Sequence, residues 1–222
     1  MLQGIKNIIF DLGGVICDLE MERVKECFKE LGMPRMAAMM DPCYPADVNE
    51  RMESGRLSWA EACDEMRRID NCPTVTNEQI AWVYREFLAR VERSKMETIE
   101  RLRQKGFRTF VLSNTNPVAI NIVRDRVREA TGKELDDYFD HLYLSFEMGI
   151  LKPAPAIFEK MMQEGHIDPS ESLFIDDGQR NADAAHALGF SVYCPPTNGN
   201  WQQIFECPEN YTVRRWLQFV TE

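Results

Sequence analysis

Short apolar runs recur along the chain, and all but the last of them stop at a polar residue. They span residues 7–10, 109–112, 141–144, 173–175 and 191–194. Mainly apolar runs of this length are typical of strands buried on both faces of a parallel sheet. Helix-periodic segments that end at glycines separate the later runs. We therefore expect right-handed βαβ units and a three-layer, Rossmann-like α/β fold.

The region between the first two runs differs from the rest of the chain. It holds helix-like segments at residues 20–31, 36–40, 59–69 and 77–91, which proline and glycine separate, and almost nothing typical of strands. We predict that residues 18–92 form an inserted helical cap on a core made of residues 1–17 and 93–222. Two linkers, near Cys17-Asp18 and from Arg90 to Lys95, would allow the cap to close.

Composition excludes several classes of function. The 222 residues carry 26 Lys plus Arg against 36 Asp plus Glu, a formal charge of −10, which argues against a nucleic-acid partner. No apolar stretch approaches the roughly 18 residues of a membrane helix, and the first residues do not look like a secretory signal. We expect a soluble cytoplasmic protein without a membrane partner. It would be a monomer or homodimer, since an exposed Trp201 and a C-terminal helix carrying Trp216 leave room for a dimer.

Polar residues directly follow the apolar runs, at what would be the carboxyl ends of the strands. In an open parallel sheet, ligands bind at this end of the strands. In chain order the polar residues are Asp11, Ser113, Asn114, Ser145, Asp176 and Asp177. Together with the nearby Lys152, they would meet in one pocket if the sheet forms as predicted. The alternative is that each residue merely caps the helix that follows it.

The chemistry of this set favours a metal-assisted reaction of a phosphate group. Three carboxylates pressed together repel one another unless a cation neutralises them, and ligands that are all oxygen select a hard ion such as Mg²⁺. Ser113, Asn114 and Lys152 could donate to a phosphate, as could the backbone N–H groups of the Gly13-Gly14 loop. Carboxylates, magnesium and phosphate donors together indicate phosphoryl transfer.

The order of these residues resembles that of the haloacid dehalogenase-like hydrolase superfamily. The matching segments are IIFDLGGVI, FVLSNTN, GILKPAPAIF and FIDDGQRNADAAHALGF. The place of the helical insertion is similar to that of the C1 cap in subfamily IA. The amino-acid sequences of the motifs look most like those of the α-D-glucose-1-phosphate phosphatase branch. The resemblance implies a Mg²⁺-dependent phosphatase whose partner is a small phosphorylated metabolite, in particular a sugar phosphate.

The resemblance also implies a role for each matching residue. Asp11 would be the nucleophile that forms a phosphoaspartyl intermediate, with Ser113 and Lys152 holding the transferring group. The residues that would contact the phosphate are Leu12, Gly13, Ser113, Asn114 and Lys152. Those that would hold Mg²⁺ are Asp11, Asp176, Asp177 and, through its carbonyl, Gly13. Asn181 would support the acidic loop.

One position departs from the family pattern. The first motif usually has a second aspartate two residues after the nucleophile, as general acid and base, and here that residue is Gly13. Such catalysis is worth about 10²–10⁴-fold. Three possibilities stay open: a leaving group that needs little protonation, a substitute such as water or an acidic residue at 47–53, or a protein that binds phosphorylated ligands without turnover. Cap residues would choose the substrate, and the candidates are Tyr44, Arg51 and Arg56.

Overall fold

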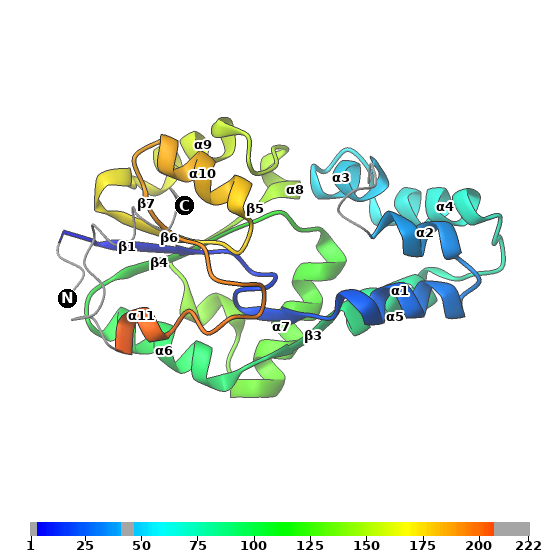
Figure 1. Ribbon diagram of the computed structural model, residues 1–222, viewed down its shortest axis with the longest axis horizontal. Helices are drawn as coiled ribbons and strands as arrows, with labels where there is room; N and C mark the ends of the chain where they lie inside the picture. The colour runs from blue at the N-terminus through cyan, green and yellow to red at the C-terminus, as the bar shows by residue number, and fades with distance from the viewer. Residues whose placement is uncertain (1–3, 41–46, 207–222) are drawn as a thin grey trace.

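The computed structural model describes residues 4–40 and 47–206 and has a parallel sheet at its centre (Figure 1). Its five strands lie in the order β5-β4-β1-β6-β7. They are β1 (Asn7–Phe10), β4 (Arg108–Ser113), β5 (His141–Leu144), β6 (Ser172–Ile175) and β7 (Ser191–Tyr193). The five strands expected from the apolar runs are confirmed, and so is the three-layer α/β fold.

Helices cover both faces of this sheet (Figure 1). One face carries α6 (Arg93–Gln104), α7 (Pro117–Thr131) and α11 (Gln203–Glu206). The other carries α9 (Pro155–Gly165) and α10 (Gln179–Ala187). The short turns η1 (Leu135–Tyr138), α8 (Ser145–Met148) and η2 (Pro169–Glu171) complete the connections. Within the described part of the chain, no helix combines the length and apolar character needed to cross a bilayer.

Alternate residues of the central strand pack into different layers. Ile8 and Phe10 belong to the apolar cluster on the α6 and α7 side, whereas Ile9 belongs to the cluster with α9 and α10. Successive side chains of a strand point to opposite faces. Because both faces are covered, successive side chains of the strand are buried, which is why a run of neighbouring apolar residues identified it.

The exposed position expected for Trp201 was wrong. Its side chain is fully buried, and its indole Nε1 donates to the carbonyl of Val15 at 2.9 Å. Its ring lies against Phe10, with the ring centroids 5.1 Å apart. The tryptophan therefore fills the core beneath β1 and offers no surface for a dimer. Trp216 and the predicted C-terminal helix lie outside the described residues.

The chain leaves the sheet between β1 and β4 and forms a helical insertion. Its helices are α1 (Met21–Glu30), α2 (Pro34–Met39), α3 (Asp47–Glu53), α4 (Trp59–Asp70) and α5 (Asn77–Phe87). Ser58 and Thr76 begin α4 and α5 with capping boxes, in which each side chain accepts from the third residue of its helix. The helix expected over residues 77–91 ends early. Leu88–Val91 is instead β3, which pairs antiparallel with β2 (Cys17–Leu19).

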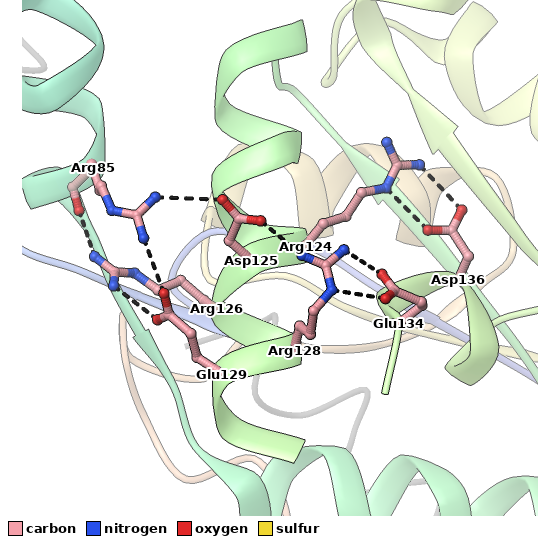
Figure 2. A network of polar contacts seen from close by, with 8 residues as sticks. All are labelled: Arg85, Arg124, Asp125, Arg126, Arg128, Glu129, Glu134 and Asp136. Atoms are coloured by element: carbon pink, nitrogen blue, oxygen red, sulfur yellow. Dashed lines mark hydrogen bonds and ion pairs between the residues drawn. The ribbon is translucent and has the colours of Figure 1, made fainter. Parts of the chain in front are cut away.

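Polar contacts tie both ends of the insertion to the core. In the β2–β3 ribbon, Asp18 accepts from Arg90 and from Lys95, each at 2.9 Å, and the Lys95 side chain is only 2% exposed. On α7, the guanidinium of Arg126 donates to the carbonyls of Arg85 and Leu88 at the end of α5. Figure 2 shows this arginine among the ion pairs that join Arg85 to α7. The two linkers expected near residues 17–18 and 90–95 are thus fixed at several points.

Candidate active site

Three carboxylates meet at the carboxyl-terminal edge of the sheet. Asp11 follows β1, and Asp176 and Asp177 follow the neighbouring strand β6. One oxygen from each of the three lies within 4.8 Å of the others. Ser113, the last residue of β4, borders the same place because β4 pairs with the other side of β1. The topology therefore gathers residues that are far apart in the sequence, as expected from the strand ends.

Lys152 is the cation at the centre of this cluster. Its Nζ lies 2.6 Å from Asp176 Oδ2 and 3.0 Å from Asp11 Oδ2, and its side chain is 1% exposed. The side chain of Asn114 holds the backbone of this lysine from both sides, accepting from Lys152 N at 2.8 Å and donating to Lys152 O at 2.9 Å. The amide of Asn114, expected to meet the phosphate, is thus occupied in placing the lysine.

The acidic loop after β6 is held by its own neighbours. Asp176 Oδ1 accepts from Gly178 N at 2.8 Å and from Asn181 Nδ2 at 3.0 Å, which is the supporting contact that the resemblance implies for Asn181. Asp177 Oδ2 accepts from Thr197 Oγ1 at 2.5 Å. Gly14 lies against the same carboxyl group, since a Cβ on Gly14 would be 2.3 Å from Asp177 Oδ2. The absence of a side chain at Gly14 lets the two loops meet.

The charges of the site are out of balance. The pKa of Asp11 is raised to about 7, because burial and the nearby charge of Asp176 together outweigh the lowering by Lys152. Burial also raises the pKa of Asp177. For Lys152, burial lowers the pKa but the carboxylates of Asp11 and Asp176 raise it more, so the lysine stays charged. One ammonium facing three carboxyl groups leaves room for a further cation, and a set of oxygen ligands fits Mg²⁺.

A cavity of about 230 Å³ opens above the cluster, between the sheet edge and the insertion. Its polar lining is Asp11, Gly13, Glu53, Ser113, Asn114, Thr115, Asn116 and Asp177. Its apolar and aromatic lining is Leu12, Leu19, Tyr84, Phe87, Leu88, Ala119 and Val123. The cavity is smaller than the roughly 300–1,000 Å³ of clefts that hold drug-sized ligands. Its volume therefore suits a small ligand with a polar end toward Asp11 and an apolar wall on the insertion side.

The residues expected to choose the substrate are not those that the structure brings to the cavity. Among the described lining residues there is neither Arg51 nor Arg56. Arg51 pairs with Glu65 inside the insertion, and Arg56 pairs with Glu50 at 3.1 Å. Tyr44 lies outside the described residues. The insertion instead presents Glu53 from the acidic stretch at 47–53, together with side chains of α5 that the sequence analysis did not single out.

One lining residue that we missed did have a signal in the sequence. Asn116 begins α7, and its Oδ1 accepts from Val118 N at 3.1 Å and Ala119 N at 3.0 Å. Asn followed by Pro at the first helical position is a common helix start. Tyr84 and Phe87 gave no comparable signal, because their spacing on α5 is equally typical of packing inside the insertion.

Comparisons with known proteins agree with this geometry. A family model for haloacid dehalogenase-like hydrolases matches residues 5–189. A D-ribitol-5-phosphate phosphatase from Bacteroides thetaiotaomicron is 36% identical over 202 residues, which cover 90% of this chain and 96% of that protein. The solved structure of a predicted HAD-like family hydrolase from Porphyromonas gingivalis has a TM-score of 0.84 and 35% identity, covering 94% of this chain and 99% of that one.

A second solved structure is that of a HAD family enzyme from Bacteroides thetaiotaomicron in complex with magnesium and inorganic phosphate. Its TM-score is 0.83 at 33% identity, covering 90% of this chain and 99% of that one. The descriptions of these three relatives do not mention α-D-glucose 1-phosphate, so the branch expected from the sequence stays a prediction. Because the matched residues include the whole acidic cluster and Lys152, the chain belongs to the haloacid dehalogenase-like hydrolase family.

Proposed function

We propose that the protein is a Mg²⁺-dependent phosphatase of a small phosphorylated metabolite, in particular a sugar or sugar-alcohol phosphate. The observation that carries this proposal is the cluster of Asp11, Asp176 and Asp177 around the buried ammonium of Lys152. Two comparisons support it: a relative acts on D-ribitol 5-phosphate, and a similar structure holds magnesium and inorganic phosphate. The small cavity suits a substrate of that size.

In this mechanism Asp11 attacks phosphorus and forms a phosphoaspartyl intermediate. Asp176 and Asp177, with Asp11 and the carbonyl of Gly13, would hold Mg²⁺, which when bound neutralises the carboxylates and the phosphate charge. Lys152, already 3.0 Å from Asp11, balances the charge of the transferring group. Ser113 donates to the Asp11 carboxyl from the end of β4, which lowers the pKa of Asp11.

The remaining contacts to the phosphate would come from the cavity floor. Leu12, Gly13 and Asn114 all line the cavity, and we propose that their backbone N–H groups face the phosphate when it enters. In the free protein the N–H of Leu12 donates to Asp11 Oδ1 at 2.7 Å. Backbone N–H groups in such loops are good anion ligands because they are fixed before the anion arrives.

We further propose that residues 18–92 act as a cap over a core of residues 1–17 and 93–222. The cavity has one wall from each part, so a substrate would be enclosed between them. Enclosure excludes water and strengthens the electrostatic interactions inside the site. Selectivity among phosphorylated compounds would then depend on Tyr84 and Phe87, which the cap contributes.

A panel of phosphorylated metabolites, assayed for phosphate release with Mg²⁺ present, tests the proposal. It should include pentitol, pentose and hexose phosphates. We expect turnover that falls at least about 10³-fold in Asp11→Asn, since removing a nucleophile leaves only the binding contribution, and that stops in a chelator. The rival hypothesis is a protein that binds phosphorylated ligands without hydrolysis, as the glycine at position 13 could suggest. It would be favoured if the wild type released phosphate no faster than Asp11→Asn while still binding Mg²⁺ and phosphate.

A further inference from the structure

The proposed reaction lacks a proton donor at the usual position. Gly13 carries no side chain, and a Cβ built there would lie 3.4 Å from both methyl groups of Leu19. The space beside Gly13 is therefore bordered by an apolar side chain. Hydrolysis of an alkyl phosphate produces an alkoxide leaving group, which needs a proton as the bond to phosphorus breaks. The donor has to come from another side chain that reaches the cavity.

Glu53 is the carboxyl group of the described cavity lining that lies outside the metal cluster. It stands at the end of α3 and lines the cavity from the insertion. Within the described part of the chain, no hydrogen bond or ion pair occupies its carboxyl group. The groups that face it are Asp11, Lys152, Glu50 and Tyr84. A carboxyl that lacks partners but lines a site is available for contact with a ligand.

The backbone at Glu53 is anchored to the core. Ser145, the fully buried residue after β5, donates from its Oγ to the carbonyl of Glu53 at 2.6 Å. The same Oγ accepts from the N–H of Thr115 at 2.9 Å. Thr115 lies two residues after Ser113, in the loop that follows β4. Ser145 thus joins the end of α3 to that loop through a single hydroxyl group.

A second contact fixes the same point. Gly55 has φ +70°, and a Cβ there would lie 2.5 Å from the carbonyl oxygen of Phe146, the residue after Ser145. The insertion and α8 therefore approach so closely at Gly55 that a side chain would not fit. With the Ser145 bond on one side and this contact on the other, the backbone at Glu53 is held beside the cavity.

We propose that Glu53 is the general acid and base of the reaction, and that Ser145 is the positioning residue that holds it over Asp11. This inference rests on the proposed phosphatase function. In the first step, an Asp11 oxygen bonds to phosphorus, the bond from phosphorus to the leaving oxygen breaks, and the Glu53 proton moves to that oxygen. In the second, the Glu53 carboxylate takes a proton from water as the water oxygen bonds to phosphorus and the aspartyl bond breaks. Asp11 and a protonated Glu53 are restored.

A protonated carboxyl is compatible with the surroundings of Glu53. The pKa of Glu53 is raised to about 7, chiefly by burial and in addition by the negative charges of Asp11 and Glu50, while Lys152 opposes the rise. The position of the group over the cavity nevertheless carries the proposal, because a proton has to be delivered within reach of the leaving oxygen.

The dependence on the leaving group separates this role from a structural one. For an alkyl phosphate that the wild type hydrolyses, we expect Glu53→Gln to lower kcat/KM by about 10²–10⁴-fold. For p-nitrophenyl phosphate, whose leaving group needs no proton, the loss should stay below about 10-fold. Glu53→Asp should retain more alkyl phosphatase activity than Glu53→Gln. The matched control is Glu50→Gln. Glu50 is an exposed glutamate on the same helix, paired with Arg56, and its replacement should leave kcat/KM unchanged for both substrates.

Equal losses on both substrates, or no loss on the alkyl phosphate, would overturn the role of Glu53. Ser145→Ala tests the positioning: its kcat/KM should fall more for the alkyl than for the aryl phosphate, because only the alkyl leaving group needs the proton, and equal falls in kcat/KM would overturn that part. Circular dichroism and thermal unfolding would verify that each variant folds. If the wild type is more active than Asp11→Asn in the same assays, the phosphatase function is supported whatever the Glu53 variants show. Failure of the Glu53 role can therefore be distinguished from failure of the phosphatase function.

Discussion

Replacing Gly14 with alanine should damage the metal site far more than the fold. The added Cβ would lie 2.3 Å from Asp177 Oδ2, 2.8 Å from its Cγ and 3.1 Å from its Oδ1. The atoms in the way belong to the end of a flexible side chain, so the carboxyl group of Asp177 can rotate aside without moving the backbone. Doing so separates it from Asp11 and Asp176 and breaks its hydrogen bond with Thr197.

The two costs can be estimated separately. Gly14 has φ +71°, and an L-residue in this left-handed region costs about 1–2 kcal/mol. For a chain of this length each kcal/mol lowers Tm by about 2–4 °C, so the variant should melt about 2–8 °C below the wild type. Displacing one of three carboxylate ligands should weaken Mg²⁺ binding at least about 10-fold. Even the loss of a residue that only hydrogen-bonds to a metal ligand lowers metal affinity by about 10-fold or more.

The neighbouring glycine supplies the control. The backbone at Gly13 lies outside the left-handed region, and a Cβ there meets only the Leu19 methyl groups at 3.4 Å. Titration of phosphatase activity with Mg²⁺, together with calorimetric Mg²⁺ binding, would compare Gly14→Ala with Gly13→Ala. We expect the half-saturating Mg²⁺ concentration to rise only in the first. The same Mg²⁺ dependence in both variants would refute the idea that Gly14 exists to admit Asp177.

Two further perturbations test the charges of the structure. Because the pKa of Asp11 is raised from 3.8 to about 7 in the folded protein, the metal-free fold holds a proton that the unfolded chain has lost, and stability should fall as pH rises between these values. In urea unfolding with a chelator present, the free energy of unfolding of Asp11→Asn should therefore rise relative to that of the wild type from pH 4.5 to 7.5. A difference between the two free energies that stays constant over this range would contradict the raised pKa. Asp18→Asn leaves the buried ammonium of Lys95 without its carboxylate partner and should cost about 3–5 kcal/mol. The double variant with Lys95→Met should recover most of that loss in the same unfolding assay.

The sheet and the acidic cluster were predictable because local sequence patterns determine them. A strand covered by helices on both faces buries successive side chains, so apolar residues follow one another, as Ile8, Ile9 and Phe10 do. The carboxyl ends of parallel strands lie at one edge, so Asp11 and Asp176 could be placed together from the strand order alone. Neither inference requires knowing how distant side chains pack.

The errors arose where distant contacts decide the outcome. Leu88–Val91 continues the pattern of α5 in the sequence, but pairing with Cys17–Leu19 turns it into a strand. That pairing joins segments far apart in the chain, and no short-range pattern encodes it. Trp201 was misplaced for the same reason, since its partners Val15 and Phe10 lie at the other end of the sequence.

Glu53 shows why the cap residues of such a site are the hardest to predict. The sequence alone does not distinguish Glu53 from the other acidic residues at 47–53. The contacts of this segment with Ser145 and Phe146, which are distant in the chain, determine which of them faces the cavity. The same docking has a kinetic consequence. The proposed proton donor and the aromatic wall formed by Tyr84 and Phe87 belong to one inserted unit. A substrate that fits this wall badly would therefore also leave the carboxyl displaced from the leaving oxygen, so discrimination among phosphate esters should appear in kcat as well as in KM.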